Sequence, residues 1–247
     1  MRSLLDTHFH LDFVDDPARL IASLSDAKVA IIAQTLLPSA YQAQRDGYED
    51  RNDTRLALGF HPWEIVDDDQ VARELEVFDT QVATTSFIGE VGLDFAPRHL
   101  ENKKRQVQVF THILGRATAG HVLSIHAVRS AGAVVDLIEE TATQATAVIH
   151  WFSGTSDELT RLMRAGGYIS VNPRMLETKR GRAFIRQVPA ERLLLETDFP
   201  ATRGADATDT AAATIGALNG LYQAITQLRG EDIGEILTAT QHRLFGI

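Results

Sequence analysis

The amino-acid sequence predicts an α/β fold in which eight parallel β-strands alternate with α-helices and close into a (β/α)8 TIM barrel. Short apolar runs alternate regularly with helical segments along the chain, and its length of 247 residues suits one barrel. An open, doubly wound parallel sheet is the alternative. Such a sheet usually has a glycine-rich phosphate loop after its first strand, whereas residues 12–16 contain no glycine. We therefore expect a single barrel domain over residues 1–247.

Eight apolar runs have the length of buried strands and are bounded by turn residues. Their side chains are largely Leu, Ile, Val and Ala, which is typical of parallel strands covered by helices. Proline ends the third run at Pro62 and the eighth at Pro200. In order, the expected strands begin at Leu4 and then cover residues 28–34, 55–62, 86–94, 121–126, 145–150, 168–171 and 192–198.

Helical segments separate these strands. The clearest covers residues 69–82, where Val71, Leu75, Phe78 and Val82 recur at spacings of three and four. Another stops at Gly166-Gly167, a usual helix end. The remaining helical segments are expected at 17–25, 39–50, 100–119, around 134–138, 155–165, 178–188, and in two stretches between 209 and 247 that separate near Gly230.

Composition excludes several classes of protein. The chain has no cysteine, so disulfides and thiolate zinc sites are excluded. The first expected strand begins within a few residues of Met1, so we expect no signal peptide, and no apolar run is long enough to cross a bilayer. We expect a cytoplasmic protein. Its net charge of −9 argues against a basic surface that wraps duplex nucleic acid, although bound cations could still attract a phosphate substrate.

Residues suited to metal chemistry gather at the carboxyl ends of the expected strands. His8 and His10 are two apart and point to one side of an extended chain. The other such residues are His61, Glu90, His126, His150 and Asp198. The carboxyl ends of barrel strands converge on one mouth, where active sites of this fold lie. The sequence therefore predicts a metal site built from imidazoles and carboxylates.

The carboxylates have distinct expected roles. Glu90 has two oxygens and could bridge two cations, a pair of which suits displacement at phosphorus. None of the lysines ends an expected strand, so a carboxylated lysine is a poorer bridge than Glu90. Asp198 could ligate one ion and accept a proton from the attacking water, or it could simply cap the next segment. Glu90 and Asp198 are thus the expected catalytic residues.

The chain resembles the TatD family of metal-dependent hydrolases, within the amidohydrolase-like barrels. The stretches that carry the resemblance follow the family's order and cover nearly the whole chain; they are residues 6–12, 59–62, 89–94, 125–126, 149–154, 194–198 and 243–246. The resemblance implies a TIM barrel and a two-metal hydrolase, usually a deoxyribonuclease. Carried over, one ion (Mg, Mn or Zn) takes His8, His10, Glu90 and Asp198, the other takes Glu90, His126 and His150, and His61 faces the substrate phosphate.

Two stretches depart from the family's pattern. The usual His-Ser-Arg after the fifth strand reads His126-Ala127-Val128-Arg129 here, so Arg129 is either a displaced phosphate ligand or a plain surface arginine. The proline- and asparagine-rich stretch after the last strand is replaced by small and polar residues over 202–210. That stretch follows the expected last strand, so substrate choice is the property most affected.

Within the family, the chain resembles QatD, the TatD-like nuclease of the Qat anti-phage system. Residues 109–114, 123–126, 150–154 and 180–182 carry this likeness, which implies an ATPase, a queuosine-synthesis-like protein and a further subunit as partners. The leading hypothesis is a DNase acting on single-stranded DNA or DNA ends. The alternatives are an ester or amide hydrolase, such as a D-aminoacyl-tRNA deacylase, and a mainly structural subunit of a defence complex.

Overall fold

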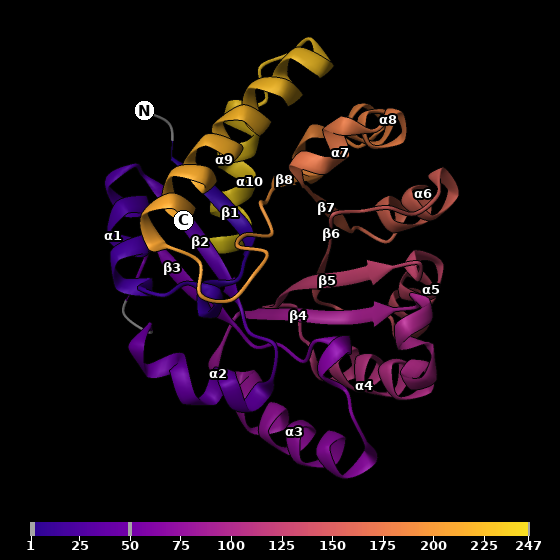
Figure 1. Ribbon diagram of the computed structural model, residues 1–247. Coiled ribbons are helices and arrows are strands. Elements are labelled where there is room, and N and C mark those ends of the chain that lie inside the picture. The colour runs from indigo at the N-terminus through magenta and orange to yellow at the C-terminus, as the bar shows by residue number, and fades with distance from the viewer. Residues whose placement is uncertain (1–2, 49–50, 247) are drawn as a thin grey trace. The chain divides into compact units, whose positions relative to one another are not determined.

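The computed structural model describes residues 3–48 and 51–246 (Figure 1). Within these residues, eight strands alternate with helices in the predicted order. The strands are β1 (Leu4–Phe9), β2 (Val29–Gln34), β3 (Thr54–Ala57), β4 (Phe87–Asp94), β5 (Val122–Val128), β6 (Thr146–His150), β7 (Tyr168–Val171) and β8 (Leu193–Leu195).

Several helices begin at ordinary capping residues. Asp16 and Asp67, for example, accept hydrogen bonds from backbone N–H groups three residues further on. The α-helices are α1 (Pro17–Asp26), α2 (Pro38–Gln44), α3 (Asp68–Gln81), α4 (Lys103–Arg116), α5 (Ala131–Thr141), α6 (Ser156–Arg164), α7 (Pro173–Glu177), α8 (Lys179–Gln187), α9 (Ala207–Arg229) and α10 (Gly234–Phe245). Short 3-10 helices are η1 (Leu11–Phe13), η2 (Arg45–Gly47), η3 (Pro62–Glu64), η4 (Val82–Thr84), η5 (Pro97–Asn102) and η6 (Ala190–Arg192). Among all helices of the described residues, none combines the length and the apolar character that a membrane crossing requires.

The described chain divides into two compact units. The first, here called the terminal unit, takes both ends of the chain and contains residues 3–33, 51–55 and 169–246. The second, the central unit, contains residues 34–48 and 56–168. The single domain expected over residues 1–247 stays a prediction.

In the terminal unit, β1 pairs in parallel with β2, with Leu4 opposite Val29, and β7 pairs in parallel with β8. Phe9 also forms an isolated parallel bridge with Phe199, just beyond β8. Every residue of β1 and β2 is buried, as their apolar runs predict. Figure 1 shows α9 alongside α1, and the two helices pack against each other. The first and last parts of the chain thus share one core.

In the central unit, β4, β5 and β6 form consecutive parallel pairs, with Val122 between Phe87 and Thr146. Figure 1 shows β4 and β5 side by side. Helix α4 packs on β4 and on α5, and α5 packs on α6. All eight residues of β4 are buried, including the acidic Glu90 and Asp94. Two buried carboxylates on one apolar strand require polar partners, and those partners form the site described below.

Two strands are shorter than the sequence predicts. The third ends at Ala57 rather than Pro62, and the eighth ends at Leu195 rather than Asp198. After Ala57 the pairing becomes irregular. Leu58 keeps an isolated parallel bridge to Ile88, and the Phe60 N–H bonds to the Glu90 carbonyl oxygen, but the Gly59 N–H bonds to the Thr35 hydroxyl oxygen. After Leu195, polar side chains turn to hydrogen-bond partners inside the terminal unit. Each strand therefore ends shortly before a candidate ligand, His61 in one case and Asp198 in the other.

Three helical segments also differ from the prediction. The segment expected over 100–119 is η5 followed by α4, which ends at Arg116. The segment expected over 39–50 is α2 followed by η2, and its last two residues lie outside the described ones. The short helix α7 was not predicted, because its five residues are too few to show helical periodicity.

Candidate metal centre

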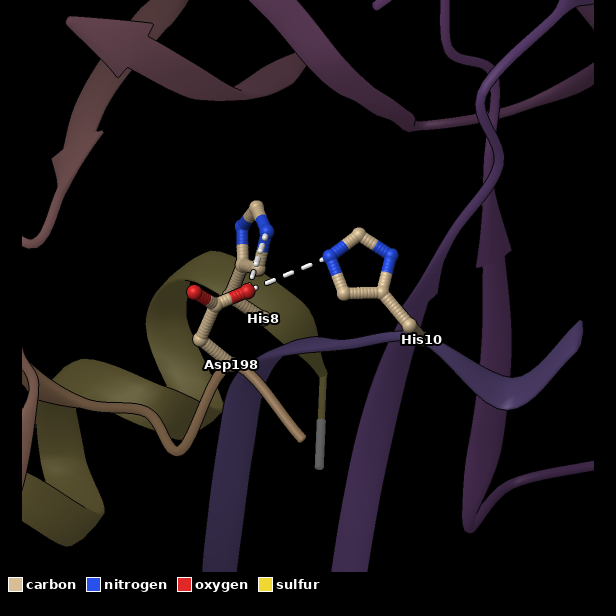
Figure 2. Close-up of side chains that lie close together, drawn as sticks. All are labelled: His8, His10 and Asp198. Carbon is tan, nitrogen blue, oxygen red and sulfur yellow. Dashed lines mark hydrogen bonds and ion pairs between the residues drawn. The ribbon is translucent and has the colours of Figure 1, made fainter. Parts of the chain in front are cut away.

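One group of candidate ligands lies within the terminal unit and comes from both ends of the chain. His8 is near the end of β1, His10 follows this strand directly, and Asp198 lies just beyond β8. The Nε2 atoms of His10 and His8 are 3.1 Å and 3.7 Å from Asp198 Oδ1. Figure 2 shows both rings beside this one oxygen. These three residues are called the terminal cluster; both histidines are buried, and the Asp198 side chain is 26% exposed.

A buried carboxylate, Asp6, ties together the two segments that carry the terminal cluster. Its Oδ1 accepts hydrogen bonds from the backbone N–H of His8 at 3.1 Å and of Thr197 at 3.0 Å. The Thr197 hydroxyl donates to its second oxygen. Burial raises the pKa of Asp6 to about 7, although the hydrogen bonds from Thr197 and His8 partly offset this effect. Asp6 therefore acts on the cluster through the backbone.

The backbone that leads to Asp198 is fixed by further polar contacts. The buried Glu196 accepts a short hydrogen bond from the Ser170 hydroxyl and another from Asn172 Nδ2 at 3.2 Å. The same amide nitrogen donates to the Thr197 carbonyl oxygen at 3.2 Å. Asp198 has a φ of 60°, in the left-handed region that L-residues rarely adopt. These contacts hold Asp198 in a conformation that an isolated chain would avoid.

The second group of candidate ligands surrounds Glu90 within the central unit. Its Oε1 lies 2.7 Å from His126 Nδ1, 3.0 Å from His150 Nε2 and 3.2 Å from His61 Nε2. All four residues are buried. They are called the central cluster, and in it one carboxylate oxygen is shared by three imidazoles. Such a group of nitrogen and oxygen donors can bind a divalent cation.

A second buried carboxylate, Asp94, supports the central cluster from the other side of His126. Its Oδ2 lies 3.2 Å from His126 Nε2 and accepts a 2.6 Å hydrogen bond from Trp63 Nε1. Burial tends to raise the pKa of Asp94, but these hydrogen bonds outweigh it and hold the pKa well below its usual range. Burial likewise tends to lower the pKa of His126, but contacts with Asp94 and Glu90 raise it instead. Asp94 is thus a charged partner that orients His126.

Two glycines permit the close backbone approaches behind this cluster. A Cβ on Gly59 would lie 1.6 Å from the carbonyl oxygen of Thr35, so only glycine fits two residues before His61. Gly92 has a φ of 133°, and a Cβ there would lie 2.2 Å from the carbonyl oxygen of His126. Glycine at both positions therefore allows the backbones that carry His61 and His126 to approach their neighbours.

Both clusters have the donor set of a divalent metal site. Within the terminal unit, one ligand atom from each of His8, His10 and Asp198 lies within 4.8 Å of the others. The same holds within the central unit for His61, Glu90 and His126. The donors are imidazole nitrogen and carboxylate oxygen, and the sequence has no cysteine. This chemistry suits Mn²⁺ or Zn²⁺, and the carboxylates also suit Mg²⁺.

The predicted site residues thus fall into one cluster in each unit. His61, expected to face the substrate phosphate, lies against Glu90 and is also a candidate ligand. Arg129, the other expected substrate contact, directly follows β5, is exposed, and has a φ of 54°. It is not part of either cluster as defined here.

Three supporting residues were not predicted from the sequence. Asp6 lies two residues before His8, and Asp94 lies four residues after Glu90. In an extended strand, an even spacing places side chains on the same face, so this alternation could have indicated both aspartates. Trp63 directly follows the His61-Pro62 motif, but nothing in its local pattern indicates a bond to Asp94. That bond depends on how η3 packs against β4.

Comparison with known proteins places the chain in a family. The model of the family described as TatD related DNase matches residues 5–246. An uncharacterized metal-dependent hydrolase, YcfH of Escherichia coli K12, is 32% identical over 80% of this chain and 77% of its own. Human deoxyribonuclease TATDN3 is 28% identical over 96% of this chain and 91% of its own.

The fold has a solved counterpart. The crystal structure of the TatD homologue YjjV from Escherichia coli K12 has a TM-score of 0.80 and 23% identity, and the match covers 99% of this chain and 98% of that one. This likeness confirms the predicted fold class, an α/β fold of the TIM-barrel type. The family match also confirms the broader part of the resemblance drawn from the sequence. The chain belongs to the TatD-related DNase family and is a metal-dependent hydrolase.

Proposed function

We propose that this chain is a DNase that hydrolyses phosphodiester bonds with two divalent metal ions, acting on single-stranded DNA or DNA ends. One observation carries the proposal: in a chain of the TatD-related DNase family, a buried carboxylate lies within 3.2 Å of three buried imidazoles. The proposed metal ligands are His8, His10, Glu90, His126, His150 and Asp198.

The two clusters support different roles for their carboxylates. Divalent ions held there would supply an acidified water and positive charge beside the phosphate. Asp198 is partly exposed, so it can exchange a proton with water and is the proposed proton acceptor. Glu90 is buried among imidazoles and is proposed to hold metal rather than to move a proton. His61 and Arg129 are the proposed contacts to the substrate phosphate.

The preference for single strands rests on charge and on a relative. A net charge of −9 gives little attraction for the dense phosphates of a duplex. A relative from Pectobacterium atrosepticum, 29% identical over 76% of this chain, is named a 3'-5' ssDNA/RNA exonuclease. A single strand or a frayed end needs fewer phosphate contacts than a duplex does.

The test is cleavage of end-labelled substrates by the purified protein in Mg²⁺, Mn²⁺ or Zn²⁺, with bound metal measured in parallel. We expect single strands and tailed duplexes to be cut faster than blunt duplexes, and EDTA to abolish cleavage. Glu90→Gln should cleave these substrates far more slowly than wild type. His112→Ala is the matched control, because its imidazole pairs with Asp79 outside both clusters. Protein with metal bound that hydrolyses an aminoacyl ester but no DNA would instead establish the acyl-hydrolase alternative.

We also propose a role in anti-phage defence beside the proteins of a Qat system, from the likeness of residues 109–114, 123–126, 150–154 and 180–182 to QatD. Phage protection should be lost in Glu90→Ala with Asp198→Ala while folding and assembly stay normal. Protection that survives this double substitution would indicate a structural subunit rather than a nuclease.

A further inference from the structure

We propose that Trp63 is a stacking platform for a nucleobase, which binds the nucleotide whose phosphate reaches the central cluster. The inference rests on the proposed nuclease function and deepens it. It is carried by three features of this one residue within the central unit: its exposure, its fixed orientation and its position beside the candidate ligands.

Trp63 is exposed although it is one of the largest apolar side chains. It lies in η3, and 49% of its surface is accessible. Large aromatic side chains are usually well buried, because each one removes a large apolar area from water. An indole that stays half exposed beside a candidate active site is thus available to a ligand.

The exposed ring is also held in place. Trp63 Nε1 donates a 2.6 Å hydrogen bond to Asp94 Oδ2. Its backbone N–H donates to His61 Nδ1 at 3.0 Å. The residue is therefore anchored at both its backbone and its ring to the surroundings of the central cluster. A ring held this way loses little conformational entropy when a flat ligand stacks on it.

The ring lies next to candidate ligands. Its centroid is 4.9 Å from the ring centroid of His61 and 5.9 Å from that of His126, and both contacts are edge-on at 74°. A phosphate and the base of the same nucleotide are a few ångströms apart. A nucleotide whose phosphate reaches this cluster can therefore place its base on the indole.

Two residues of η5 already contact the ring, one over it and one stacked on it. The Arg98 guanidinium carbon lies 4.9 Å from the ring centroid. The His99 ring stacks on the indole at 5.4 Å with an interplanar angle of 15°. Arg98 Nε donates to His99 Nε2 at 2.9 Å, so the two side chains are linked. An arginine cation here suits the next phosphate of a strand, and Trp63 stays half exposed with both neighbours in place.

The chemistry of the platform determines what it recognises. The one polar atom of the indole, Nε1, is already bonded to Asp94. The exposed part of the ring therefore offers π-surface beside the stacked His99 and no free hydrogen-bond donor, and every base has a face that can stack on such a surface. The platform should bind all bases similarly but require an unstacked base. This requirement predicts a preference for single strands and frayed ends that is independent of sequence.

The test compares base-bearing and abasic substrates. A set of single-stranded oligonucleotides carries one abasic nucleotide at successive positions, and kcat/KM is measured for each with wild type, Trp63→Leu and Trp63→Phe. We expect one abasic position to lower wild-type kcat/KM about tenfold, the usual scale of base stacking. Trp63→Leu should abolish that difference, and Trp63→Phe, which keeps a ring, should retain most of it.

Val66→Ala is the matched control, because Val66 lies shortly after Trp63 and is 64% exposed. It should behave as wild type. Because Trp63 also contacts Asp94, Trp63→Leu could lower kcat/KM for every substrate by disturbing the metal site. The ratio of kcat/KM for the intact oligonucleotide to that for the abasic one separates this general loss from the loss of base stacking. If this ratio were the same in Trp63→Leu as in wild type, the proposed stacking of a base on Trp63 would be wrong. Wild type that cleaves DNA without any abasic effect would also overturn it and leave the nuclease intact. Wild type that cleaves no DNA would overturn both proposals.

Tryptophan fluorescence gives a readout without turnover. The chain has two tryptophans, so a signal that is present in wild type and absent in Trp63→Phe belongs to Trp63. With EDTA to prevent cleavage, a thymidine dinucleotide should quench this signal, and its abasic counterpart should not. Equal quenching by both compounds would contradict base stacking.

Discussion

The terminal and central clusters use the same side-chain types in opposite ways. In the terminal cluster, two imidazoles approach one carboxylate, Asp198, whose side chain is 26% exposed. In the central cluster, three imidazoles approach one carboxylate, Glu90, whose side chain is only 3% exposed. A partly exposed carboxylate can exchange protons with water, whereas a buried one surrounded by imidazoles is suited to holding a cation.

The supporting carboxylates differ as well. Asp94 contacts the ring of His126 directly, so it sets the orientation and charge of that candidate ligand. Asp6 instead accepts hydrogen bonds from the backbone N–H groups of His8 and Thr197, so it fixes the positions of the two segments that carry the terminal cluster. The central cluster is therefore organised by side-chain chemistry, and the terminal cluster by backbone placement. This contrast predicts how strongly substitutions in each should act.

The largest effect is expected for Glu90→Gln. The amide retains the shape of the side chain but has no negative charge and presents a donor toward three imidazoles. We expect kcat/KM for single-stranded DNA to fall about 10³-fold, equivalent to several kcal/mol of lost metal-ion catalysis. Bound metal, measured by mass spectrometry after desalting, should fall in parallel. Full metal content with full activity would show that Glu90 is not a ligand.

Asp198→Asn should act mainly on turnover. If Asp198 accepts the proton from the attacking water, kcat should fall about 10²-fold while KM changes little. The loss of bound metal should be smaller than in Glu90→Gln, because the Asp198 side chain is partly exposed to water whereas that of Glu90 is buried among three imidazoles. The slope of log kcat against pH on the acidic limb is the measurement that separates the roles. An unchanged slope would leave Asp198 as a ligand alone.

The contrast also explains what the sequence could predict. The strands, and the residues at their carboxyl ends, follow from apolar runs and alternation, which are local properties. These local properties indicate His8, His10, Glu90 and His126 as candidate ligands. The sequence alone also placed the eight strands in order, because each needs only a short run of residues.

The supporting contacts could not be predicted because they depend on packing between distant segments. The bond between Trp63 and Asp94 joins residues that are 31 apart in sequence. The strand expected to run to Asp198 ends at Leu195, because Glu196 and Thr197 find polar partners that no local pattern shows. Local periodicity thus located the candidate ligands, whereas tertiary structure determined their partners.

Asp94→Asn should have a smaller effect than either ligand substitution. It removes the charge behind His126 while it keeps the side chain's shape, and the loss of such a partner typically weakens metal affinity 10- to 100-fold. Metal titration with a competing chelator measures the change. Asp136→Asn is the control, because Asp136 is exposed and pairs with Arg161 away from the cluster. Asp6→Asn should weaken metal less than Asp94→Asn, because Asp6 acts through the backbone.

The smallest effect is expected at a carboxylate–imidazole pair outside both clusters. Asp79 Oδ1 lies 2.8 Å from His112 Nε2, and Asp79 Oδ2 lies 2.7 Å from Arg116 Nη2. Burial tends to raise the pKa of Asp79, but hydrogen bonds to His112 and Arg116 lower it below its usual value. The folded state therefore releases this proton more readily than the unfolded state. The resulting stabilisation is present above about pH 4 and is lost as the pH falls further.

Asp79→Asn should accordingly reduce the free energy of unfolding by about 0.5–1 kcal/mol at pH 7, and the difference from wild type should shrink at pH 3.5. Urea unfolding at the two pH values in the presence of EDTA is the measurement. Metal content and cleavage should stay at wild-type levels, since this pair has one imidazole and lies on α3 and α4. If Asp79→Asn instead lowered the amount of bound metal, the Asp79–His112 pair would also contribute to metal binding. A short distance between a carboxylate and an imidazole would then not be enough to identify the terminal and central clusters as the metal sites.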